Sequence, residues 1–140
     1  MPSEACHRES VTTPAPDPVG RLGATSIDCP DPAALANFYG ALLGMRRLVE
    51  SPDGGVVAIS DGMHVLAMMR VADYVAPGWP DAGQLQQMHL DVSVRDLDAA
   101  VAAAVALGAR EAGHQSDPGR WRVLIDPAGH PFCLTTVGPD

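Results

Sequence analysis

Three polar side chains alternate with apolar ones in the stretch 88–94, and this pattern carries the clearest chemical signal in the sequence. His89, Asp91 and Ser93 fall on one face of an extended strand, and the residues between them are apolar. A carboxylate beside an imidazole can fix the ring tautomer or raise the ring pKa, and either effect prepares a general base. We therefore predict His89 and Asp91 as catalytic residues. A solvent-exposed strand face is the alternative interpretation.

Other predicted strands, near the start, middle and end of the chain, also place polar or flexible side chains on one face. A methionine belongs with them because its flexible thioether suits an adaptable apolar wall. A nucleophilic cysteine would need a lowered thiol pKa, and no sequence neighbour of Cys133 supplies one, so this cysteine is interpreted as structural. The predicted ligand-binding residues are Ser26, Asp28, Ser93, Cys133, Thr135 and Met69.

Two helices are predicted directly after two of these strands. Asp31 and Asp96 are typical N-cap residues, and Gly44 and Gly108 are typical C-terminal caps. Between the caps, apolar residues recur at the helical period and form one stripe on each helix. The stripes are Leu35, Phe38, Tyr39, Leu42 and Leu43 in the first helix, and Leu97, Val101, Ala104 and Val105 in the second.

The chain repeats itself at a spacing of about 65 residues, each copy reading strand, helix and three strands. His64 and His130 occupy matching turns before the last strand of each copy, where turn hydrogen bonding is their expected role. This predicts an α+β fold of two tandem βαβββ modules, within a single domain at 21–138. The expected parts are a disordered N-terminal extension at 1–20, a first module at 21–71, a linker at 72–86 and a second module at 87–138.

Bulk composition limits the class of protein. A chain of 140 residues with 46% hydrophobic content suits one globular domain. A net charge of -8 argues against a nucleic-acid binder, which needs a basic face. No apolar run reaches the roughly 20 residues of a membrane span, and no signal-peptide segment is present. Three cysteines without metal-type spacing favour reduced thiols, so we expect a cytoplasmic protein without membrane or nucleic-acid partners.

The repeat and its motifs resemble the vicinal oxygen chelate superfamily, which includes glyoxalase I, extradiol dioxygenases and bleomycin-resistance proteins. The resemblance covers about 22–137, and the stretch 87–91 is similar to the branch called the glyoxalase-like domain. It implies that the two sheets form a cup-shaped cavity that binds a small molecule. The motifs are IDCPDP (27–32), FY (38–39), LLGM (42–45), HLDVSVRDLDAA (89–100) and DPAGHPFCL (126–134).

Metal-using members of the superfamily place four ligands in the cup, typically His or Gln, then Glu, then His, then Glu. Transferred to this sequence, those positions fall on Ala24, Ala67, His89 and Cys133. Alanine has no donor atom, and one His with one Cys does not hold a catalytic metal alone. No metal ligand and no cofactor are therefore predicted, although Asp28 and Asp91, one step along the same strand faces, could substitute in a divalent-metal site.

Three functions are compatible with this pattern. The first is a metal-independent protein that binds an apolar or aromatic metabolite, with acid/base chemistry by His89 and Asp91. The second is a divalent-metal lyase, isomerase or dioxygenase with a redistributed ligand set. The third is an antibiotic-sequestering binding protein without chemistry. Superfamily members of this length often dimerise, sometimes exchanging modules, so a homodimer is expected. Tyr74 and Trp79 in the linker are expected to pack as apolar side chains.

Overall fold

The protein folds as two successive copies of one unit, which we call module one and module two. A computed structural model describes residues 13–15, 17–18, 20–78 and 88–136. The predicted extension at 1–20 and the linker at 72–86 lie partly outside these residues, and Trp79 lies outside them entirely. Module one contains β1 (Thr25–Cys29), α1 (Pro32–Leu43), β2 (Arg46–Glu50), β3 (Val56–Ser60) and β4 (Val65–Arg70). Module two contains β5 (Leu90–Ser93), α2 (Leu97–Leu107), β6 (Arg110–Glu111), β7 (Trp121–Ile125) and β8 (Pro131–Thr135).

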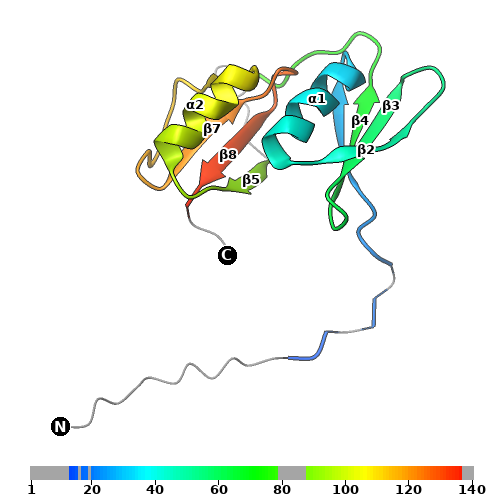
Figure 1. The fold of residues 1–140 in the computed structure, drawn as a ribbon, viewed down its shortest axis with the longest axis horizontal. Coiled ribbons are helices and arrows are strands. Elements are labelled where there is room, and N and C mark those ends of the chain that lie inside the picture. The colour runs from blue at the N-terminus through cyan, green and yellow to red at the C-terminus, as the bar shows by residue number, and fades with distance from the viewer. Residues whose placement is uncertain (1–12, 16, 19, 79–87, 137–140) are drawn as a thin grey trace.

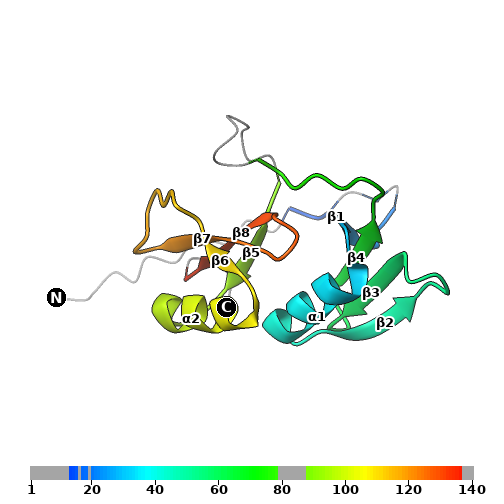
Figure 2. The same cartoon turned by 90° about the horizontal axis from the view of Figure 1, so that it is seen from above.

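Each module builds its own four-stranded sheet, and the two sheets are not joined into a closed barrel. The strand orders are β1-β4-β3-β2 and β5-β8-β7-β6. In both sheets the first and last strands of the module run parallel, and all other neighbours are antiparallel. Figures 1 and 2 show α1 and α2 side by side on the same side of the two sheets. The predicted α+β fold of two tandem βαβββ modules is confirmed.

The helix boundaries follow the predicted capping residues. The side chain of Asp31 accepts a hydrogen bond from the backbone N–H of Ala34, and Asp96 does the same for Ala99. Gly44 ends α1 at φ 68°, the left-handed conformation that glycine adopts without strain. The helices have 12 and 11 residues, and no helix in the described part of the chain is long and apolar enough to cross a membrane.

The apolar stripe of α1 is confirmed, whereas that of α2 is narrower than predicted. Leu35, Phe38 and Tyr39 are buried, as expected from their spacing. In α2 only Ala104 is buried, and Val105 is 46% exposed. Val105 therefore lies beyond the part of the predicted stripe that contacts the core.

The hydrophobic core is shared between the modules. The rings of Phe38 and Tyr39 on α1 meet the ring of Phe132 on β8 at centroid distances of 5.9 and 6.1 Å, in edge-to-face arrangements. The hydroxyl of Tyr39 also donates to Oδ2 of Asp126 across 2.6 Å, and Asp126 is only 3% exposed. Burial, together with the neighbouring Asp126 carboxylate, raises the pKa of the Tyr39 hydroxyl far above its ordinary value, so it remains a donor.

A second set of contacts between the modules surrounds the turn from β7 to β8. Nε2 of His130 lies 2.6 Å from the backbone oxygen of Asp28 and 3.1 Å from the hydroxyl of Tyr74. Tyr74 donates to the backbone oxygen of Ala128 across 2.7 Å, which confirms that this side chain packs against the domain. The prediction that His130 makes turn hydrogen bonds is also confirmed, because its backbone N–H donates to Asp126.

Candidate functional site

The strand register groups the predicted residues into two sets on two sheets. In module two, Asp91 lies opposite Cys133 and Ser93 lies opposite Thr135 in the parallel pair β5/β8. In module one, Ser26 lies opposite Ala67 and Asp28 lies opposite Met69 in the parallel pair β1/β4. Paired residues of neighbouring strands share a face, so each set occupies one face of its own sheet. The same register makes Ala67 the counterpart of Cys133.

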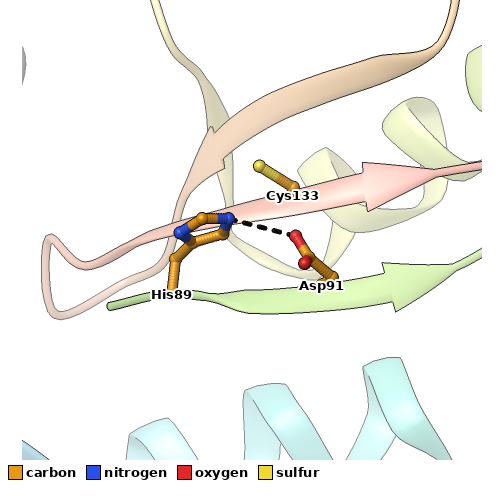
Figure 3. A group of neighbouring side chains, drawn as sticks. All are labelled: His89, Asp91 and Cys133. Carbon is orange, nitrogen blue, oxygen red and sulfur yellow. Dashed lines mark ion pairs between the residues drawn. The ribbon is translucent and has the colours of Figure 1, made fainter. Parts of the chain in front are cut away.

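The module-two set contains a compact cluster of His89, Asp91 and Cys133. Nε2 of His89 lies 3.1 Å from Oδ1 of Asp91, and one ligand atom from each of the three residues lies within 4.8 Å of the others. The side chain of His89 is 32% exposed and that of Asp91 is 63% exposed, whereas Cys133 is buried. Figure 3 shows the imidazole pointing along β5 toward the Asp91 carboxylate, with the thiol of Cys133 on the neighbouring β8.

The Cys133 thiol is kept protonated by its surroundings. Burial raises its pKa to about 11, and the negative charge of Asp91 adds to the increase because it repels a thiolate. A thiol with a raised pKa is a poor nucleophile. The environment therefore agrees with the interpretation of Cys133 as structural in the metal-free protein.

A cavity of about 370 Å³ lies between the two modules and reaches this cluster through Asp91. One wall is the edge strand β5, and the opposite wall combines the start of β1, the end of α1 and the turn from β3 to β4. Asp91 and Ser93 are the predicted site residues that line it. The lining residues are Leu22, Gly23, Ala24, Thr25, Leu43, Met45, Asp61, Met63, His64, Val65, Leu66, Leu90, Asp91, Val92 and Ser93.

The remaining predicted ligand-binding residues lie outside this lining. Cys133 and Thr135 lie beside Asp91 and Ser93 on the neighbouring strand β8, and Thr135 donates a hydrogen bond to the backbone oxygen of Arg120. Ser26, Asp28 and Met69 lie on the other sheet. Their role in ligand binding stays a prediction.

Two residues of the cavity wall, Asp61 and His64, were not predicted as site residues. Oδ1 of Asp61 accepts from the backbone N–H groups of Met63 and His64 at 2.9 and 2.7 Å, and Oδ2 lies 3.1 Å from Nδ1 of His64. These bonds hold the pKa of the Asp61 carboxyl well below its usual range. The sequence indicated a turn here, and the turn is present. The position of this turn beside β5 depends on how the two modules pack together, and no local sequence pattern predicts that packing.

The four-ligand metal arrangement of the superfamily does not fit this chain, because Ala24 and Ala67 supply no donor atoms. The module-two cluster supplies one nitrogen, one oxygen and one sulfur donor within 4.8 Å of one another. A mixed set of this kind suits zinc or a similar transition-metal ion, which would displace the thiol proton of Cys133 on binding. All three donors belong to module two.

Comparison with known proteins agrees with this architecture. A family model described as a glyoxalase-like domain matches residues 24–135. A fosfomycin resistance protein from Mesorhizobium loti is similar in structure, with a TM-score of 0.63, 16% identity, and coverage of 86% of this chain and 94% of that one. A glyoxalase family protein from Enterococcus faecalis has a TM-score of 0.60, 22% identity, and coverage of 84% and 98%. The glyoxalase I of Leishmania major has a TM-score of 0.60, 21% identity, and coverage of 83% and 86%. No curated protein matches the sequence significantly.

Proposed function

The chain belongs to the glyoxalase-like domain family of the vicinal oxygen chelate superfamily, and on that premise we propose that it binds a small apolar or aromatic metabolite and transfers a proton with His89 and Asp91. The observation that carries this proposal is the 3.1 Å contact between Nε2 of His89 and Oδ1 of Asp91, at the edge of the cavity between the modules. The lining is largely aliphatic with a few polar groups, as in most small-molecule sites.

The geometry supports one direction for the proposed proton transfer. Nε2 of His89 lies 3.1 Å from Oδ1 of Asp91, so Nδ1 is the ring nitrogen that stays open to a ligand. Nδ1 then accepts a proton from an acidic C–H or O–H group of the ligand, and Asp91 stabilises the imidazolium that forms. His89 itself lies outside the cavity lining, so a reacting ligand extends from the cavity past Asp91 toward the ring.

The test does not require knowledge of the reaction. A ligand found by NMR screening of apolar and aromatic metabolites is incubated with the metal-free protein in D₂O, and deuterium incorporation is followed by mass spectrometry. We expect exchange that falls by about 100-fold or more in His89→Ala, the usual contribution of a general base. His114→Ala, at an exposed histidine in another loop, is the matched control.

Two results would contradict this proposal. Exchange that persists unchanged in His89→Ala would remove the assigned base. Tight binding of a ligand that has an acidic C–H group, with no exchange in the wild type, would favour a sequestering protein without chemistry.

A divalent-metal enzyme of the lyase, isomerase or dioxygenase type is the second candidate. It is favoured by the convergence of His89, Asp91 and Cys133 within 4.8 Å. A divalent ion held by these residues would polarise a ligand oxygen as a Lewis acid. Metal analysis of the purified protein decides between the candidates: stoichiometric metal that is lost in His89→Ala and kept in Asp28→Ala would replace the metal-independent proposal.

A second copy of the chain is the proposed protein partner. β1 and β5 are edge strands of their sheets in the described part of the chain, and edge strands tend to be covered. Large apolar side chains are exposed on module one, with Leu48 at 57%, Val49 at 59% and Met63 at 83% exposure. Light scattering coupled to size-exclusion chromatography should give twice the mass of one chain, and a monomer at micromolar concentration would contradict the dimer. A cytoplasmic location stays a prediction.

A further inference from the structure

A second histidine–carboxylate pair lines the same cavity from the side of module one. Asp61 and His64 belong to the turn from β3 to β4, whereas Asp91 and Ser93 belong to β5 of module two. The lining also contains apolar side chains, among them Leu43, Met45 and Leu66. The cavity therefore has an apolar body and two polar sides, each supplied by a different module.

The hydrogen bonds of the turn define what His64 offers to a ligand. The Asp61 carboxylate is ionised and accepts from Nδ1–H of His64, so Nε2 of the neutral ring is an acceptor. Among the described residues, Nε2 of His64 has no hydrogen-bond partner, and the side chain is 66% exposed. His130, at the matching turn of module two, uses its Nε2 to contact Asp28 and Tyr74 instead.

The groups at the two polar sides are mostly hydrogen-bond acceptors. Asp91 accepts on one side, and Nε2 of His64 accepts on the other. Among the described residues that line the cavity there is no Lys or Arg and there are two carboxylates, so an anionic ligand is disfavoured. A cavity of about 150 Å³ is enough for benzene. The volume of about 370 Å³ therefore accommodates one ring with a substituent at each end.

We propose that His64 is a ligand-binding residue and that the cavity takes an uncharged single-ring compound with a hydroxyl group at each end, one donating to His64 and the other to Asp91. This inference rests on the proposed small-molecule function and specifies its ligand class. Asp61 is a positioning residue, because it fixes the tautomer of His64 and does not itself need to contact the ligand.

Four matched probes test the inference by isothermal titration calorimetry at pH 8. They are 4-(hydroxymethyl)phenol, with two hydroxyl groups, 4-methylphenol and 4-methylbenzyl alcohol, with one each, and the anion 4-hydroxybenzoate. We expect the two-hydroxyl probe to bind at least fivefold more tightly than either one-hydroxyl probe. The anion should bind least.

The variant His64→Phe should weaken binding of the two-hydroxyl probe by about tenfold while changing one of the one-hydroxyl probes by less than twofold. His64→Gln keeps an acceptor oxygen and should restore most of the loss. His114→Phe, an exposed histidine in another loop, is the control and should change nothing. Thermal unfolding of each variant verifies that the fold is intact.

The failures of the two proposals are distinguishable. Equal weakening of all probes in His64→Phe, or no weakening, would overturn the role of His64, as would failure of the two-hydroxyl probe to bind at 10 mM. Deuterium exchange that depends on His89 would leave the proposed function standing in each of these cases. If deuterium exchange does not depend on His89 but probe binding still depends on His64, the proposed proton transfer is overturned and the proposed ligand class stands.

Discussion

The turns before β4 and β8 are stabilised by the same aspartate hydrogen bonds to the backbone, but their side chains contact different parts of the molecule. In each turn one carboxylate oxygen of an aspartate accepts two backbone N–H groups, from Met63 and His64 in module one and from Ala128 and His130 in module two. The second oxygen differs. Oδ2 of Asp61 contacts His64 of the same turn, whereas Oδ2 of Asp126 accepts a hydrogen bond from Tyr39 of the other module.

At the four ligand positions typical of the superfamily, side chains with a donor atom are found in module two and not in module one. Module two has His89 before β5 and Cys133 on β8, and the corresponding positions of module one are Ala24 and Ala67. Module one thus contributes a polar turn to the cavity, and module two contributes a polar strand. Among the described residues, the turn that lines the cavity therefore comes from module one only, and the first-strand carboxylate that lines it comes from module two only.

The largest expected difference between the two turns is in stability. Asp126→Ala leaves the buried Tyr39 hydroxyl and two backbone N–H groups without their acceptor, so the free energy of unfolding should fall by about 3 kcal/mol or more. Asp61→Ala should cost much less, because water replaces its exposed hydrogen bonds. Urea denaturation of both variants measures the difference. Equal losses would show that the Tyr39 contact does not stabilise the packing of the modules.

A smaller difference in stability is expected between substitutions of the glycines in the two turns, which have the same backbone φ. Gly62 and Gly129 both have φ of 94°, where a side chain is strained by about 1 kcal/mol. A Cβ on Gly129 would lie 2.6 Å from the Cβ of Ala76, whereas a Cβ on Gly62 would meet nothing within 4 Å. Gly129→Ala should therefore be more destabilising than Gly62→Ala by about 1–3 kcal/mol.

A double variant tests whether the contact with Ala76 causes this difference. Adding Ala76→Gly to Gly129→Ala removes the close contact and should recover most of the excess loss in a denaturation experiment. If the double variant is no more stable than Gly129→Ala alone, the contact with Ala76 is not the reason.

The smallest expected effect concerns the reactivity of Cys133. The Asp91 carboxylate disfavours the thiolate, so Asp91→Asn should lower the pKa of Cys133 from about 11 while burial, the larger cause, keeps it above the ordinary value. Alkylation of Cys133 by iodoacetamide at pH 8, followed by peptide mass spectrometry with a chelator present, should accelerate by a few-fold. Asp28→Asn is the module-one control. An unchanged or slower rate at Cys133 in Asp91→Asn would contradict this electrostatic coupling.

The features that could be predicted from the sequence are those fixed by neighbouring residues. Caps at Asp31 and Asp96 depend on a side chain three residues from the donor it binds, and strand alternation places Asp91 and Ser93 on one face by backbone geometry alone. The contact between His89 and Asp91 follows from the same alternation.

The features that could not be predicted depend on how the modules meet. His64 reads as a turn residue in the sequence, and only the approach of β5 makes it part of a cavity. Val105 fits a helical period, yet α2 contacts too little of the sheet to cover it. Strand alternation places Ser26 and Asp28 on a predicted cavity wall; they lie outside the lining that contains Asp91, and their role in ligand binding stays a prediction.

The bond between Tyr39 and Asp126 also constrains how the chain acquires its structure during synthesis. The two residues are separated by 87 positions, and Phe132, which completes the aromatic contacts of α1, emerges from the ribosome later still. Module one therefore leaves the exit tunnel with the apolar face of α1 partly uncovered. Its final stabilisation must wait until β8 has been translated, so the two modules acquire their native stability together rather than one after the other.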